Sequence, residues 1–325
     1  MSFREHLRLF AHFGALPALA AGEETLIGGQ AVLEGVMMRA PHSYCVAVRN
    51  PAGEMVTDER PLSRISEKYP IFRYPILRGV GTLGQAMAVG IRALQFSAKA
   101  VIEEPEPDKA KKEIPGWVLG LNLAISLVFF LFLYKFVPLY LATVLGNPFP
   151  ALKGRILFNL TDGVIRMAIF IAFLYLLSQW KDMRRLFEYH GAEHRVVFNY
   201  ESGRPVTVEN AQSFSTFHPR CGTSFLLVVM LVSIAVYTLL PFDSFLLKLA
   251  GRIVLLPLIV GLSYEAIRYA GKHRSGLMAT LTAPGLWLQR ITTKPPADDQ
   301  TAVAIRALEG AMALEQEQGG TLVVA

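Results

Sequence analysis

Residues 190–194, with the sequence HGAEH, have types and spacing that suit metal chemistry. On a helix, residues four positions apart lie on one face, so His190 and His194 can bind one metal ion with Glu193 beside them. The order His-x-x-Glu-His is the inverted zinc-peptidase arrangement, in which the carboxylate takes a proton from a metal-activated water. The alternative is a polar helix near a membrane whose side chains contact lipid head groups or Arg195.

His218 and Cys221 form a second candidate pair, in the short chelating spacing His-x-x-Cys. Imidazole and thiolate both suit zinc, so this pair with His190 and His194 makes a tetrahedral set. A closed set of four protein ligands is usually structural, whereas a catalytic site keeps one position for water. The number of ligands therefore separates the two kinds of site. Arg220, which lies between His218 and Cys221 in the sequence, is a candidate for contacting the metal ligands from outside the site.

Cys221 has two further interpretations. Thr223 and Ser224 are expected caps of the apolar segment that follows, and the amides at a helix N-terminus stabilise a thiolate. A nucleophilic Cys221 assisted by His218 is one alternative, and a buried, inert thiol is the other. Cys45 lies far away in the sequence, and in a cytoplasmic setting both cysteines should be reduced.

The composition indicates that these residues belong to a membrane protein. Hydrophobic residues make up 52% of the 325 positions and charged residues 18%, against about 25% charged in ordinary soluble chains. A membrane-spanning helix needs about 20 apolar residues. Four stretches qualify, at roughly 117–141, 156–180, 223–240 and 253–270.

The basic residues predict an orientation. If all four stretches span the membrane, the basic clusters within 109–112, 181–185 and 272–274 fall on the same side. Short connections rich in Lys and Arg stay on the cytoplasmic side of a membrane. We therefore expect a multi-pass protein of the bacterial inner membrane with both termini cytoplasmic. Nucleic acid is not an expected partner, because basic and aromatic residues are not interleaved. The oligomeric state is left open.

The predicted fold class is membrane α-helical, with about four transmembrane helices and a cytoplasmic α+β portion that contains a small N-terminal sheet. Residues 44–49 and 54–58 flank a turn-forming set and read as a hairpin, and 30–39 is expected to add one strand. The segments are an amphipathic region 1–24, an α+β region 25–102 that ends in a Gly/Ala-rich helix, a linker 103–116, a membrane region 117–271 with the His-rich loop 181–222, and a tail 272–325 with a helix.

Ionisable residues inside the apolar stretches are functional candidates. Glu265 lies near the cytoplasmic end of the fourth stretch, with Arg268 one turn later. The separation in sequence between His194 and Glu265 resembles that between the motif and the third, carboxylate ligand of inverted zinc peptidases. Asp162 and Arg166 form a similar pair, for which a structural ion pair is the favoured interpretation. Residues 79–84 match a dinucleotide-binding string, but helix packing explains them better because no strand-helix-strand pattern follows.

Four separated motifs resemble the bacterial YqhQ-like family of unknown function. They are GGQAVLEGVMMR at 28–39, HGAEH at 190–194, HPRCGTS at 218–224, and PGLWLQ at 284–289 followed by two threonines. Members are described as predicted metal-dependent enzymes of the membrane, so the resemblance implies a metal site. It also directs attention to Glu34, Gln30 and Arg39. Glu34, with Gln30, is a candidate oxygen ligand or partner of an imidazole, and a structural polar contact is the alternative.

The leading hypothesis is a zinc-dependent hydrolase at the cytoplasmic membrane surface, with His190 and His194 as ligands, Glu193 as general base and His218 or Cys221 completing the site. Zinc or another divalent metal is the expected cofactor. The expected partners are the lipid bilayer and a membrane-protein or lipid-linked substrate. The alternative is a non-enzymatic membrane scaffold or binding protein, with or without a structural metal. A transporter is a weaker hypothesis, since the four stretches hold few polar groups to line a path.

Overall fold

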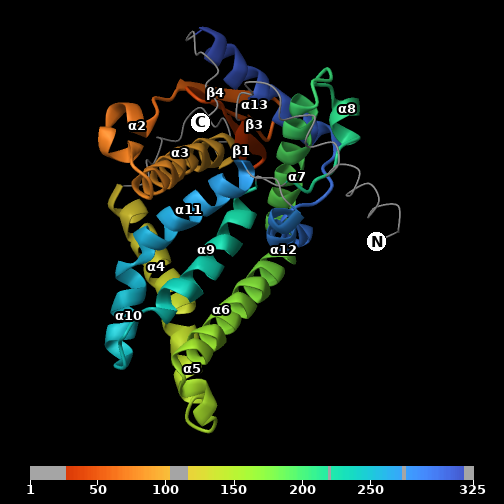
Figure 1. The fold of residues 1–325 in the computed structure, drawn as a ribbon. Helices are drawn as coiled ribbons and strands as arrows, with labels where there is room; N and C mark the ends of the chain where they lie inside the picture. The colour runs from red at the N-terminus through yellow and green to blue at the C-terminus, as the bar shows by residue number, and fades with distance from the viewer. Residues whose placement is uncertain (1–26, 103–115, 219–220, 273–275, 318–325) are drawn as a thin grey trace.

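The computed structural model describes residues 27–102, 116–218, 221–272 and 276–317. A small sheet and its covering helices form one end of the molecule, and apolar helices extend away from them (Figure 1). The predicted amphipathic segment 1–24, nearly all of the linker 103–116, and Arg220 lie outside the described residues.

The N-terminal region forms a four-stranded antiparallel sheet in the order β1-β2-β3-β4. The strands are β1 (Gly28–Val32), β2 (Gly35–Arg39), β3 (Ser43–Arg49) and β4 (Met55–Pro61). The predicted hairpin is confirmed as β3 and β4. The prediction of one strand over 30–39 is wrong, because the chain reverses at Leu33 and Glu34, where Glu34 adopts a positive φ of 51°. Residues 28–39 are therefore a second hairpin.

Both faces of the two central strands, β2 and β3, are buried, whereas β4 is largely exposed. Side chains of one face, including Met38 and Cys45, pack against α7 (Lys181–Glu201) and α13 (Asp298–Glu317), and those of the other face pack against α3 (Leu77–Ile102). Figure 1 shows the sheet between these two layers. The predicted α+β portion with a small N-terminal sheet is therefore present, and it includes helix α7 of the His-rich segment and the C-terminal helix α13.

The Gly/Ala-rich helix α3 packs both on the sheet and on a second helix. A Cβ added at Gly79 would collide with Tyr264 of α11 (Leu256–Lys272), and one added at Gly90 would collide with Gln30 of β1. Small residues thus allow close approach on two sides of α3. Residues 79–84 lie within α3, and a Cβ at Gly81 would collide with Phe72, whereas one at Gly84 would meet nothing within 4 Å. The helix-packing interpretation therefore holds for Gly79 and Gly81.

The apolar segments form long helices. Residues of α4 (Gly116–Leu131), η3 (Phe132–Phe136) and α5 (Val137–Leu145) follow one another without a break, and α6 (Arg155–Ser178) comes after a short turn. By length and composition, the described residues contain two candidate spans, Gly120–Leu145 and Arg155–Ser178. Both expose large apolar side chains, including Leu127 and Ile156, which suits contact with lipid.

The third and fourth predicted spans differ from expectation. α9 (Gly222–Thr238) is apolar but shorter than the two candidate spans. The stretch 253–270 is divided between α10 (Phe245–Val254) and α11, which meet at an angle of 51°. Pro257 follows this break, and proline removes a backbone donor from a helix. The pair counts as a third span only if it crosses as one bent unit.

Short elements and one further helix complete the described chain. The tail segment 277–291 lies in α12 (Gly276–Thr292), which contacts α9 and α6 and so returns the chain to the apolar helices. The remaining elements are α2 (Ile65–Lys68), η2 (Pro70–Arg73), η4 (Pro150–Lys153) and α8 (Val208–Gln212).

Candidate metal centre

The HGAEH run lies in the middle of α7, and the sheet determines which way it faces. Tyr189, Ala192 and Val196 of the same helix are buried in the core between the sheet and α13. Residues between these positions therefore project toward the segment before α9. A Cβ at Gly191 would overlap the backbone carbonyl of Lys294, so glycine is required for this close approach.

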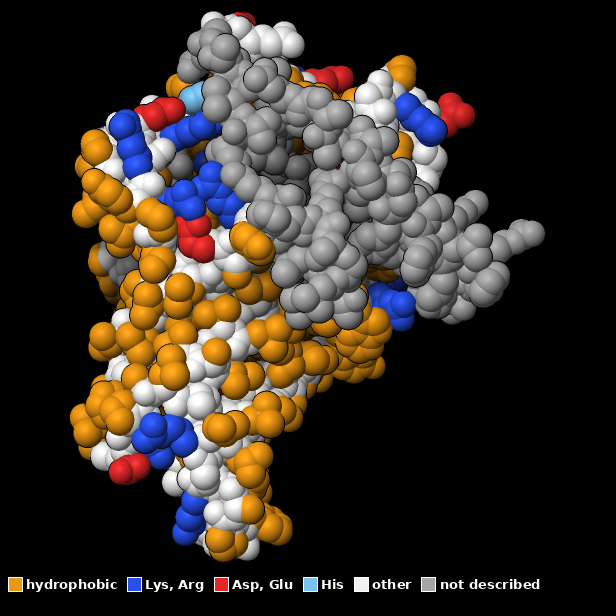
Figure 2. Space-filling model, viewed as in Figure 1, with side chains coloured by type: hydrophobic (Ala, Val, Ile, Leu, Met, Phe, Trp, Pro, Cys, Tyr) orange, Lys and Arg blue, Asp and Glu red, His pale blue; other side chains and the backbone are white. Residues whose placement is uncertain are grey.

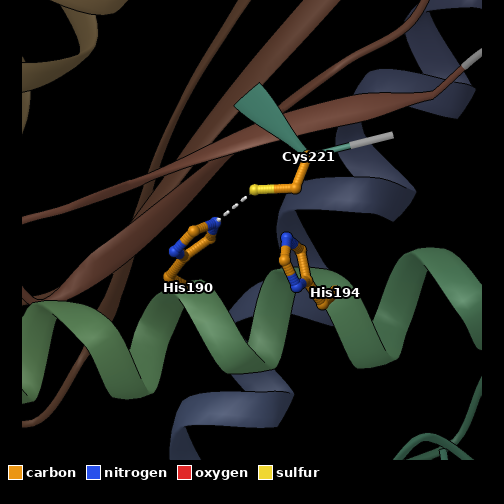
Figure 3. Close-up of side chains that lie close together, drawn as sticks. All are labelled: His190, His194 and Cys221. Atoms are coloured by element: carbon orange, nitrogen blue, oxygen red, sulfur yellow. Dashed lines mark hydrogen bonds between the residues drawn. The ribbon is translucent and has the colours of Figure 1, made fainter. Parts of the chain in front are cut away.

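Three side chains converge there. The ligand atoms of His190, His194 and Cys221 all lie within 4.8 Å of one another, and Cys221 Sγ is 3.3 Å from His190 Nε2. Figure 3 shows both rings on one face of α7 with the thiol above them. Atoms bound to one zinc ion lie about 2.0–2.3 Å from it and hence roughly 3–4 Å apart. The group needs only small adjustments to hold one ion.

Cys221 occupies the N-cap position of α9. The prediction that Thr223 and Ser224 cap this helix is wrong, since both lie inside it. Thr223 Oγ1 instead lies 3.3 Å from the thiol sulfur. The amides at a helix N-terminus favour negative charge, so this position suits a thiolate ligand. The thiol contacts His190 Nε2, so His190 takes the place predicted for His218 beside Cys221.

Backbone carbonyls orient both imidazoles for metal binding. His190 Nδ1 is 2.8 Å from the carbonyl oxygen of Thr292, and His194 Nδ1 contacts that of Thr216. A carbonyl can only accept, so each Nδ1 carries the hydrogen and each Nε2 keeps its lone pair. Burial lowers the pKa of His194, which further favours the neutral ring. A metal-binding histidine usually donates its other ring N–H to a carbonyl or carboxylate in the same way.

Glu193 lies beside the group and is itself buried. Its Oε2 atom is 3.5 Å from His194 Nε2 and 4.0 Å from His190 Nε2. Burial raises the pKa of the carboxyl group, whereas the nearby His190 and His218 and the backbone N–H of Gly29 act in the opposite direction. A Cβ at Gly29 would collide with the Glu193 side chain. Strand β1 thus passes directly over this carboxylate.

His218 is outside the group of three. Its Nε2 atom is 3.4 Å from Glu201 Oε2, and its ring packs on Phe198 with 4.4 Å between centroids. Burial lowers the pKa of His218 to about 4. Gln289 holds the backbone of His218 through two hydrogen bonds of 2.8 Å, one to N–H and one to C=O. Among the described residues, three predicted ligands come together and the fourth lies alongside.

The residues of the 28–39 motif are used elsewhere. Glu34 accepts hydrogen bonds from Arg185, one of 2.6 Å, and lies 3.3 Å from the Tyr189 hydroxyl. Gln30 packs against Gly90 of α3. Neither belongs to the group of ligand atoms, so the expectation of an oxygen ligand gives way to its structural alternative. Glu34 instead ties the β1–β2 turn to α7.

Two further candidates also take structural partners. Arg39 donates to Gln85 of α3 at 3.2 Å. Glu265 accepts hydrogen bonds from Arg78, one of 2.6 Å, and from the Ile76 backbone. Arg78 is the hydrogen-bonded partner because α3 packs alongside α11, and the expected partner Arg268 acts only as a nearby positive charge. Glu265 therefore links these helices and is not among the converging ligand atoms.

The two cysteines are predicted to differ in reactivity. Burial, assisted by Glu59, raises the pKa of Cys45 to about 12, so at pH 8 it stays a covered thiol and should resist iodoacetamide. Cys221 is partly exposed and should be alkylated in the folded, metal-free protein. Stoichiometric Zn²⁺ should protect it. Peptide mass spectrometry checks both effects, and equal labelling of Cys221 with and without Zn²⁺ would contradict its role as a ligand.

The donor set fits a divalent metal that prefers nitrogen and sulfur ligands. Two neutral imidazoles and one thiol supply three protein donors, and catalytic zinc sites commonly have three, with the remaining position available to other molecules. The carboxylate of Glu193 is close enough to accept a proton from a molecule bound at that remaining position. From the sequence, no role was predicted for Thr216, Thr292, Gln289 or Gly29. Gly29, Gln289 and Thr292 lie within motifs that resemble the family, whereas Thr216 carries no such signal.

Comparisons with known proteins place the chain in a family. The model of the family "Protein of unknown function (DUF1385)" matches residues 74–314. The chain is 35% identical over 298 residues to the uncharacterized protein YqhQ of Bacillus subtilis (strain 168), covering 89% of this chain and 92% of that one. No solved structure matches. The chain therefore belongs to the DUF1385 family, whose function is unknown, in agreement with the resemblance noted from its motifs.

Proposed function

We propose that this protein is a zinc-dependent hydrolase that works at the cytoplasmic surface of the bacterial membrane. The observation that carries the proposal is the convergence of His190, His194 and Cys221 with Glu193 beside them. Three protein donors with an adjacent carboxylate are the parts of a hydrolytic zinc site. When bound, zinc supplies the Lewis acidity that activates a water molecule.

Each residue has a distinct role in this proposal. The Nε2 atoms of His190 and His194 and the Sγ atom of Cys221 hold the metal. Glu193 Oε2 accepts a proton from the attacking water and returns it to the leaving group. The carbonyls of Thr216 and Thr292 keep the two rings in the required tautomer. Gln289 positions the segment that leads to Cys221.

The position of the site supports a membrane-linked substrate. Cys221 precedes the first residue of α9, an apolar helix that packs against the candidate span α6. The site therefore lies where the sheet unit meets the apolar helices. A substrate held by a lipid or by another membrane protein would reach this junction from the bilayer.

Substitution of Glu193 by glutamine tests the proposal. Zinc-loaded wild-type protein in lipid nanodiscs should hydrolyse a member of a panel of ester, phosphodiester and peptide substrates. Loss of a general base costs about 10²–10⁴-fold in rate, so Glu193→Gln should lower turnover by that factor. Zinc content, measured by elemental mass spectrometry, should stay at about one equivalent, because Glu193 is not assigned as a ligand.

Glu188→Gln, a carboxylate-to-amide change on the same helix, is the matched control and should retain activity. A Glu193→Gln protein that is as active as wild type would contradict the proposal. Retained zinc with no turnover by the wild-type protein would instead favour the alternative, a structural metal in a membrane scaffold. The burial of His194, which is 2% exposed, is the observation that favours this second function.

A further inference from the structure

A second polar cluster lies among the apolar helices. Asp162 and Arg166 of α6, Arg252 of α10 and Lys135 of η3 are each at most 5% exposed. The predicted pair of Asp162 and Arg166 is present, but it is part of this larger set. Ionised groups in such surroundings cost several kcal/mol each unless they are paired and hydrogen-bonded.

Asp162 is the shared acceptor of the cluster. Its two carboxylate oxygens accept from Arg166 and Arg252, and Arg252 also donates to Asn159 Oδ1 at 2.9 Å. Lys135 donates to the Tyr237 hydroxyl at 2.9 Å. The Tyr237 ring lies 5.0–5.4 Å from all three cationic groups, so it contributes cation–π attraction.

These contacts leave positive charge in excess. A guanidinium group is never deprotonated in proteins, so Arg166 and Arg252 together carry one charge more than Asp162 can balance. Lys135, when protonated, adds a second. Arg166 Nε is also buried without a hydrogen-bond partner among the described residues. The cluster therefore favours an additional anion nearby.

A cavity of about 230 Å³ adjoins the cluster on one side. Its lining includes Asn159, Tyr237 and Arg252, which are all buried members of the network. Ligand pockets usually have volumes of about 300–1,000 Å³. The smaller volume here suits a compact charged group and excludes a large ligand held entirely inside.

The rim of this cavity is also basic. Lys153, Arg155 and Lys248 line it together with a single acidic residue, Asp243. Lys153 ends η4, in the connection between α5 and α6, and Arg155 is the first residue of α6. Asp243 lies between α9 and α10, and Lys248 lies in the first half of α10. Figure 2 shows Lys and Arg side chains gathered at that end of the helices, away from the sheet. Exposed apolar side chains of Leu246 and Val254 lie on α10.

We infer that this cavity binds a phosphate group, with Arg252 and Asn159 at its base and Lys153, Arg155 and Lys248 at its rim. Arginine and lysine are the side chains that best match a phosphate in charge and hydrogen-bond donors. A phosphate here supplies the negative charge that Asp162 alone does not provide. Its source is either the head group of an anionic lipid or a soluble phosphate.

Thermal unfolding of the full-length protein in mild detergent tests this inference. The probes are dioleoyl phosphatidylglycerol, with dioleoyl phosphatidylcholine as reference lipid, and inorganic phosphate. A ligand that occupies the folded protein alone should raise Tm saturably, by about 4 °C or more at high occupancy. The double variant Lys153→Gln/Arg155→Gln should lose at least half of that shift. Both side chains are exposed, so the Tm without probe should stay unchanged.

The matched control is Lys181→Gln/Arg184→Gln, which removes the same two charges from exposed positions at the start of α7. It should keep the full shift. A shift with inorganic phosphate supports a soluble source, and a shift with phosphatidylglycerol alone supports a lipid head group. The inference is overturned if neither probe raises Tm, or if the rim and control variants respond alike.

Discussion

Replacement of His194 by alanine is expected to abolish stoichiometric zinc binding by the purified protein. The ring is 2% exposed, its Nδ1 contacts the Thr216 carbonyl, and its Nε2 faces Cys221 and His190. Removing it leaves two of three donors. Substitution of residues that only hydrogen-bond to the metal ligands lowers metal affinity about 10–100-fold. Loss of a direct ligand should therefore lower the zinc affinity by more than about 100-fold. Competition with a chromophoric chelator measures the affinity.

His218→Ala is the informative control for that experiment. His218 lies beside the group, with its Nε2 turned toward Glu201, and is not among the three converging donors. We therefore expect His218→Ala to lower the zinc affinity by at most about 10–100-fold, as for a residue that lies near the ligands without binding the metal. If His218→Ala loses zinc as completely as His194→Ala, the site has four protein ligands and is structural. If neither variant changes the zinc content, the three residues do not form a metal site.

Replacement of Asp162 by alanine is expected to destabilise the protein strongly. Removing one partner of a buried ion pair costs about 3–5 kcal/mol, because the other charge is left without compensation. Here the substitution leaves both Arg166 and Arg252 without their compensating negative charge, because they share this carboxylate. For domains of 150–250 residues, each 1 kcal/mol lowers Tm by roughly 2–4 °C. With a cost of about 3–5 kcal/mol, this scaling gives an expected drop of roughly 6–20 °C.

Asp182→Ala provides the comparison, since Asp182 is an exposed carboxylate in the first turn of α7. Surface changes of this kind usually alter stability by less than about 0.5 kcal/mol. Thermal unfolding of both variants in the same detergent separates a specific effect of the buried network from a general effect of net charge. A Tm for Asp162→Ala within about 1 °C of wild type would show that the network contributes little to stability.

Several parts of the fold follow from local patterns. The hairpin of β3 and β4 was predictable because a turn-forming set separates two strand-like runs. A helix was also predicted in the tail 272–325, and α13 lies there, in a segment rich in alanine and glutamate, which favour helix. The strand predicted over 30–39 failed because Glu34 carries no turn signal and adopts a positive φ in its tertiary setting.

The sequence alone also identified a shared face for His190 and His194, because helical spacing is a property of the local backbone. It could not decide which residues would join them. That choice depends on the three-dimensional approach of three separate segments, β1, the loop before α9, and residues 292–294. Carbonyl oxygens such as those of Thr216 and Thr292 are present at every position, so residue type does not mark them.

The same division holds in the apolar region. Composition identified the long helices, since transfer of apolar side chains from water depends mainly on residue type. The sequence also indicated the pair of Asp162 and Arg166 from their spacing of four residues. Only the tertiary structure brought Arg252, Lys135 and Tyr237 to this pair, because contacts between helices depend on packing angles and on breaks such as the bend between α10 and α11. Residue types and local periodicity thus specified the candidate chemistry, and long-range packing decided which groups meet.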